Sequence, residues 1–172
     1  MIEIIKKGGV GVLPTDTIYG LVGSALNKKA VEKIYYLKKR DRKKAFVILI
    51  GSEKDLDIFS VKRNKKLKDF WPGKVSIILP CSNKEFFYLH RGLNSLAFRL
   101  PEKESLRELL KKTGPLVAPS CNPEGEEPAS NIKEAKAYFP SLDFYIDEGE
   151  IKSKPSKLIK IKDNKITILR DA

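Results

Sequence analysis

The strongest constraint on the fold is an alternation between short apolar runs and longer segments whose apolar residues recur at helical spacing. The first run, Val10 to Leu13, lies between Gly8-Gly9 and Pro14. Short runs bounded by glycine and proline are typical of buried strands, because a buried helix is usually at least about ten residues long. Strands that alternate with helices favour an α/β domain, a mixed sheet with helices packed on it.

The expected elements follow from this spacing and from residues that start or stop helices. Asn27 and Ser130 are good N-caps, since their side chains can accept a bond from a free backbone N–H group. Pro101 is a suitable first residue of a helix. We expect helices over 2–7, 28–39, 61–70, 101–113 and 130–139, and strands over 10–13, 46–50, 75–79, 96–100, 116–118, 157–161 and 165–169, with a tight hairpin at Asp163-Asn164.

Length and composition indicate one cytoplasmic domain. The 172 residues suffice for a single core, and no apolar run approaches the roughly 18 residues that span a bilayer. The N-terminus has no signal-peptide pattern, so we expect no membrane partner. Cys81 and Cys121 have no metal-ligand spacing and should be reduced packing residues. The lone His90 has no motif for nucleophilic catalysis and is expected on the surface.

The net charge of +12 favours polyanionic partners such as nucleotides or RNA. Most of the basic clusters suit solvated helix faces. The segment from Lys38 to Lys44 differs, because six of its seven residues are cations. These charges repel one another, so an anion is expected beside them.

Two polar loops supply candidate chemistry. The first, Pro14 to Leu21, follows a strand, and loops on a rigid scaffold often carry binding residues. The second loop, Pro119 to Pro128, follows the strand at 116–118. Lysine, arginine, hydroxyl and amide groups from Lys38, Arg40, Ser120 and Asn122 suit an anion such as a nucleotide phosphate. Neither a Walker pattern nor G-x-G-x-x-G occurs in the sequence.

Several ordered motifs together resemble the YrdC-like threonylcarbamoyl-AMP synthase family from Ile4 to Arg170. They are P-T-D-T-I-Y-G-L at 14–21, I-Y-x-x-K-x-R at 34–40, W-P-G at 71–73, A-F-R-L-P at 97–101, G-P-L-V-A-P-S-C-N at 114–122 and P-S-K at 155–157. The resemblance implies the single-domain form of that family, a twisted mixed α/β sheet with a basic concave surface.

The same resemblance implies an activity. The family joins L-threonine, bicarbonate and ATP, with Mg²⁺, into threonylcarbamoyl-AMP and releases pyrophosphate. The product serves the threonylcarbamoyl modification of the tRNA adenosine beside the anticodon, which a separate transferase complex completes. Both nucleophiles come from the substrates, so no protein nucleophile is expected, and the protein's task is positioning and charge stabilisation.

By motif, the resemblance also divides the site residues into two sets. The set expected around ATP is Lys38, Arg40, Ser120, Asn122 and Arg170, with Lys38 and Arg40 as the catalytic, phosphate-positioning pair. The set expected around threonine is Thr15, Thr17, Tyr19, Lys44, Arg99 and Ser156.

Four residues depart from the family pattern. Asp41 and Ala45 stand where prolines are usual, Cys121 replaces an alanine, and Lys157 replaces a threonine after Ser156. Two other functions remain open at this point. One is an RNA-binding module that holds double-stranded or structured RNA without making an adenylate. The other is a carbamoyl-adenylate-forming relative.

Overall fold

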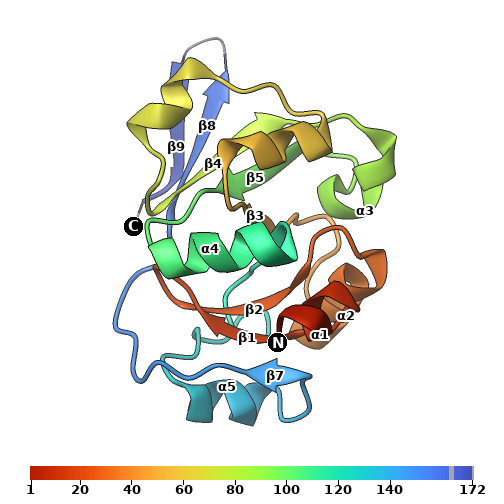
Figure 1. Cartoon of the computed structure of the whole chain (residues 1–172), viewed down its shortest axis with the longest axis vertical. Coiled ribbons are helices and arrows are strands. Elements are labelled where there is room, and N and C mark those ends of the chain that lie inside the picture. The colour runs from red at the N-terminus through yellow and green to blue at the C-terminus, as the bar shows by residue number, and fades with distance from the viewer. Residues whose placement is uncertain (163–164, 172) are drawn as a thin grey trace.

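The computed structural model describes residues 1–162 and 165–171, and its strands form one mixed sheet (Figure 1). The sheet is twisted and helices pack on it, so the predicted fold class is confirmed. Across the sheet the strands run β7 (Phe144–Tyr145), β1 (Gly11–Pro14), β2 (Tyr19–Ser24), β6 (Leu116–Val117), β3 (Val47–Leu49), β5 (Ser95–Arg99), β4 (Val75–Pro80), β8 (Lys157–Lys162) and β9 (Lys165–Arg170).

The sheet combines parallel and antiparallel pairs. Strand β3 is parallel to β5 and antiparallel to β6, while β4 is antiparallel to β5 and parallel to β8. Figure 1 shows the β8–β9 hairpin at one end of the long axis and α5 with β7 at the other. The helices are α1 (Ile2–Lys6), α2 (Lys28–Lys38), α3 (Phe87–His90), α4 (Glu104–Thr113) and α5 (Ile132–Tyr138), with 3-10 turns η1 (Glu53–Phe59), η2 (Lys65–Asp69) and η3 (Lys84–Phe86).

The helix signals in the sequence predicted α2 well. Asn27 caps it, since its Oδ1 accepts a bond from the Ala30 N–H at 3.1 Å. The helix ends at Lys38, and Lys39 adopts the left-handed conformation with φ 51°. This turn directs the chain into the basic loop between α2 and β3.

One strand of the sheet, β2, was not predicted. The sequence interpretation left Tyr19 to Leu21 in a loop, whereas all six residues of β2 are buried. A strand buried on both faces lacks the alternation that identifies strands, and glycine lowers strand propensity. Gly23 is tightly packed, because a Cβ there would lie 3.2 Å from the Ile34 side chain, which would have to shift to admit it.

The expected helix over 61–70 is wrong. Ser60 takes the left-handed conformation and ends η1, and the Asn64 side chain accepts a bond from the Lys66 N–H that starts η2. The cap of α5 is Asn131, whose Oδ1 accepts from the Glu134 N–H at 3.0 Å, and not Ser130. Strand β7, η1, η3 and α3 were also missed, and the hairpin turn at Asp163-Asn164 lies outside the described residues.

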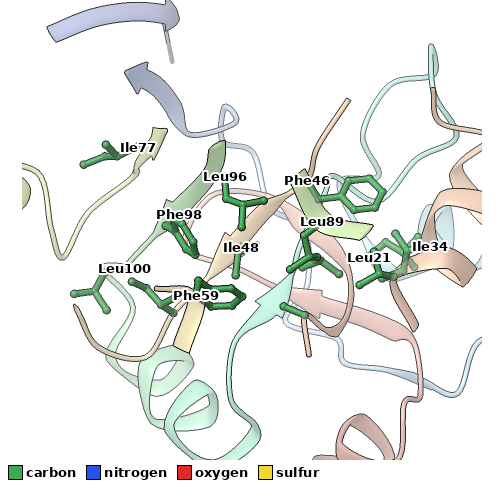
Figure 2. Close-up of a cluster of buried hydrophobic side chains, with 14 of the residues drawn as sticks. Leu21, Ile34, Phe46, Ile48, Phe59, Ile77, Leu89, Leu96, Phe98 and Leu100 are labelled. Atoms are coloured by element: carbon green, nitrogen blue, oxygen red, sulfur yellow. The ribbon is translucent and has the colours of Figure 1, made fainter. Parts of the chain in front are cut away.

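The main core joins buried residues of the sheet to residues of α2, α5, η1 and η2, and Figure 2 shows part of it. Ile48 on β3, Phe98 on β5 and Ile77 on β4 are fully buried. The Phe59 ring lies 5.2 Å from the Phe98 ring, so η1 is held against the centre of the sheet. No helix in the described ranges is long and apolar enough to cross a membrane.

The prediction for His90 was wrong and that for the cysteines is confirmed. His90 is 2% exposed, with its Nδ1 accepting from the Gly92 N–H and its Nε2 beside the Asn83 carbonyl oxygen. The imidazole therefore organises the turn after α3. Both cysteines are free and buried, and burial raises the pKa of Cys121 to about 12.

We predict that Phe98→Ala lowers the free energy of unfolding by about 3 to 5 kcal/mol, because it leaves a cavity in a fully packed core. Chemical denaturation would measure the change. The matched control is Phe87→Ala, since that ring is 58% exposed, and its expected cost is below about 1 kcal/mol. Equal losses in the two variants would contradict this view of the core.

Candidate functional site

A cavity of about 270 Å³ opens where five segments of the chain meet. These segments are the first loop, the basic loop with the start of β3, strands β4 and β5, the second loop, and the residues around β8 and β9. Hydroxyls and three guanidinium groups supply its polar lining. They belong to Thr15, Thr17, Arg40, Ser95, Arg99, Ser120, Ser156 and Arg170, and the other lining residues are Ile18, Gly20, Ala45, Phe46, Val47, Ile78, Leu93, Leu96, Ala97, Ala118, Pro119, Pro155 and Leu158.

The first loop forms a tight hydroxyl-centred turn on one wall. The Thr15 Oγ1 donates to the Ile18 carbonyl at 2.6 Å and accepts from the N–H groups of Thr17 and Ile18. The Thr17 hydroxyl lies 3.1 Å from it. The turn is thus held by its own side chains, and both threonines line the cavity.

A buried ion pair joins this turn to strand β5. Arg99 Nη2 lies 3.0 Å from Asp16 Oδ1, and the two side chains are only 5% and 2% exposed. Burial lowers the pKa of Arg99, and Asp16 acts in the opposite direction. In the described part of the chain the buried Arg99 Nε has no hydrogen-bond partner. Arg99 therefore brings to a site lined by hydroxyls a positive charge that Asp16 partly balances.

Ser156 and Arg170 form a second wall. The Arg170 guanidinium donates to the Ser156 carbonyl through Nε at 3.1 Å and through Nη2 at 2.7 Å. The Ser156 hydroxyl lies 2.8 Å from that of Ser76 on β4. Burial, and secondly Arg40, lowers the pKa of Arg170. The second cation at the cavity thus depends on the hairpin β8–β9 for its place.

Arg40 is held by stacking as well as by hydrogen bonds. Its guanidinium carbon lies 5.4 Å from the centre of the Phe46 ring, and its Nε donates to the Lys44 carbonyl at 3.2 Å. Phe46 stacks on Tyr35 at 4.1 Å, and Arg91 covers the other face of Tyr35 at 4.3 Å. Two arginines thus enclose two aromatic rings, which favours one position for Arg40 at the cavity.

The repulsion within the basic loop is relieved by two carboxylates of the chain itself. Glu124 accepts from Lys44 Nζ at 2.7 Å and from the Asp41 N–H at 2.8 Å, and both contacts lower its pKa. Glu32 pairs with Arg42 at 2.8 Å. The anion that the sequence required is therefore partly intramolecular, while Arg40 lines the cavity.

Seven of the eleven predicted site residues line the cavity, namely Thr15, Thr17, Arg40, Arg99, Ser120, Ser156 and Arg170. The other four have protein partners instead. Lys44 pairs with Glu124, Lys38 and Asn122 bond to the second loop, and the Tyr19 hydroxyl donates to the Gly149 carbonyl. Their predicted roles toward substrate stay predictions.

The sequence interpretation missed three contributors to the site. Asp16 stands inside the first motif and could have been recognised as a partner for a buried cation. Phe46 was assigned only to a strand, and Glu124 was not assigned to the site. Of the departures, Ala45 lines the cavity, Asp41 is held by Glu124, and Lys157 pairs with Asp171 at 2.9 Å.

Comparison with known proteins agrees with this geometry. Residues 3–172 match the Sua5/YciO/YrdC family, which carries the description telomere recombination. A putative threonylcarbamoyl-AMP synthase of Methanocaldococcus jannaschii is 33% identical, over 99% of this chain and 85% of the relative. A threonylcarbamoyl-AMP synthase of Marinobacter nauticus is also 33% identical, over 92% of this chain and 88% of the relative.

Solved structures show the same fold. Pyrococcus abyssi Sua5 complexed with L-threonine superposes with a TM-score of 0.88 at 28% identity, covering 98% of this chain and 52% of that one. E. coli YciO superposes with a TM-score of 0.86 at 25% identity, covering 99% of this chain and 86% of that one. The synthase names among the relatives indicate an enzyme of nucleotidyltransferase type. The chain belongs to the Sua5/YciO/YrdC family.

Proposed function

We propose that this protein is a threonylcarbamoyl-AMP synthase, which joins L-threonine, bicarbonate and ATP and releases pyrophosphate. The observation that carries the proposal is the cavity where three arginines meet several hydroxyls. The arginines are Arg40, Arg99 and Arg170, and the hydroxyls belong to Thr15, Thr17, Ser95, Ser120 and Ser156. Both ATP and the threonine carboxylate are anionic, and arginine binds phosphate and carboxylate oxygens with paired donors. A relative of the same fold has been solved with L-threonine bound.

The arrangement of the walls suggests which substrate each takes. Arg40, Ser120 and Arg170 would hold ATP phosphates, with Mg²⁺ arriving on the nucleotide. Arg99 would take the threonine carboxylate beside the hydroxyls of Thr15, Thr17 and Ser156. The apolar lining residues Phe46, Leu96 and Leu158 offer surface for the methyl group or the base.

The proposed chemistry needs no nucleophile from the protein. The threonine amine attacks the carbon of bicarbonate, and loss of water gives a carbamate. A carbamate oxygen then attacks the α-phosphorus of ATP, and pyrophosphate leaves. Alignment of reactants can lower such a barrier by roughly 7 to 11 kcal/mol, and fixed cations stabilise the charge on the leaving phosphates.

Two other properties stay predictions. The basic surface favours RNA, and the family role implies a tRNA product and a separate transferase complex as the downstream partner. Lys39 and Lys43 of the basic loop are exposed and free to contribute to such a surface. Binding of double-stranded RNA without pyrophosphate release would favour the alternative of an RNA-binding module.

The direct test of the proposed function is pyrophosphate release from MgATP and bicarbonate, with and without L-threonine. We expect release that requires threonine, with serine as the control amino acid and a much weaker substrate. Release that ignores the amino acid, or no release from protein that binds ATP, would contradict the proposal.

A second prediction concerns the stacked arginine. Arg40→Ala should raise the KM for ATP by about 10-fold to 150-fold, the loss expected for a charge-assisted hydrogen bond of about 1.5 to 3 kcal/mol. Arg42→Ala is the matched control, because Arg42 pairs with Glu32 outside the cavity lining. Steady-state kinetics would compare them, and equal effects would remove Arg40 from the nucleotide site.

A further inference from the structure

Lys38, the last residue of α2, is a buried lysine that supports the second loop. It is 1% exposed. Its Nζ lies 2.5 Å from the Ser120 carbonyl oxygen, 2.5 Å from the Asn122 carbonyl oxygen and 3.2 Å from Asn122 Oδ1. An ammonium has three N–H donors, and here all three have an acceptor. No donor remains for a phosphate oxygen.

The Asn122 side chain is used in the same way. Its Oδ1 accepts from Lys38, and its Nδ2 donates to the carbonyl oxygens of Pro123 at 3.0 Å and Glu126 at 2.6 Å. The side chain is thus bonded to the lysine and to its own loop. The backbone adds one more link, from the Glu124 N–H to the Lys38 carbonyl at 2.8 Å.

The cavity lining includes the neighbours of these two residues but not the residues themselves. Arg40 lies two positions after Lys38, and Ser120 two positions before Asn122, and both line the cavity. Lys38 and Asn122 therefore join the segments that carry those residues from behind the wall.

We propose that Lys38 and Asn122 form a hydrogen-bonded positioning pair, which fixes Ser120 and the second loop at the nucleotide subsite without contacting the phosphates. This inference rests on the proposed function for the identity of the nucleotide. In this positioning pair, both side chains affect nucleotide binding only through the conformation of the second loop.

The buried charge of Lys38 indicates that this residue does not serve to stabilise the fold. Burial, and secondly Arg40, lowers its pKa from 10.5 to about 8, while Cys121 and Glu124 act to raise it. A lysine whose pKa is lower in the folded state costs free energy of folding. This cost is complete below about pH 8 and shrinks as the pH rises toward 10.5. The ammonium is retained at neutral pH although it costs folding free energy, as expected for a group that organises a functional loop.

A double-mutant cycle on MgATP binding tests the positioning pair, with Kd measured by calorimetry at pH 7 without threonine or bicarbonate. Lys38→Met and Asn122→Ala should each weaken binding at least tenfold. If both act through the loop, the double variant should bind within threefold of the weaker single variant. If the two side chains made independent contacts, their losses of affinity would multiply, and the double variant would bind about 100-fold more weakly or worse.

The matched control is Lys39→Met, which removes the same charge from the next, exposed residue and should change Kd less than threefold. If Lys38→Met does not fold, Lys38→Gln, which keeps two N–H donors, takes its place in the cycle. Losses that multiply, or unchanged affinity in either single variant, would overturn the positioning pair but not the proposed function. Wild-type protein that binds no ATP would overturn the proposed function as well.

Discussion

The pairing of β2 with β6 is the constraint on which the site depends. It sets Gly23 opposite Val117, and the same alignment continues as an isolated bridge between Gly20 and Ser120. The Leu21 N–H donates to the Pro119 carbonyl at 2.9 Å, which extends the contact to the start of the second loop. Two loops separated by about a hundred residues are therefore fixed side by side by backbone hydrogen bonds, and the side chains that line the cavity follow from that.

Electrostatics then decide which cations reach the cavity. In the basic loop, Lys44 and Arg42 pair with carboxylates of the chain, and the Lys38 ammonium is surrounded by carbonyl oxygens. Arg40 is placed by the Phe46 ring. The run of like charges is thus divided between loop support and substrate contact, although the residues are adjacent in sequence. This division explains how a strongly basic segment can be held by contacts within the chain and still offer a cation to an anionic ligand.

Local signals in the sequence predicted much of the fold but not the details of the site. Asn27, Pro101 and the short apolar runs placed α2, α4 and most strands, because caps and breakers act within a few residues. Strand β2 was missed, since burial on both faces removes the alternating pattern. The motifs predicted seven residues that gather at the cavity, yet could not show that the Lys38 amine bonds to the second loop. Such a contact depends on side-chain direction across 82 positions of sequence, which spacing does not encode.

A crystal structure of the protein with MgATP and L-threonine would test the central claim most directly. The claim is that one cavity takes both substrates and that Lys38 supports its wall from behind. We expect the phosphates beside Arg40, Ser120 and Arg170, the threonine carboxylate beside Arg99, and Lys38 Nζ still on the carbonyl oxygens of the second loop. A nucleotide bound elsewhere, or a Lys38 amine turned toward the phosphates, would contradict the account.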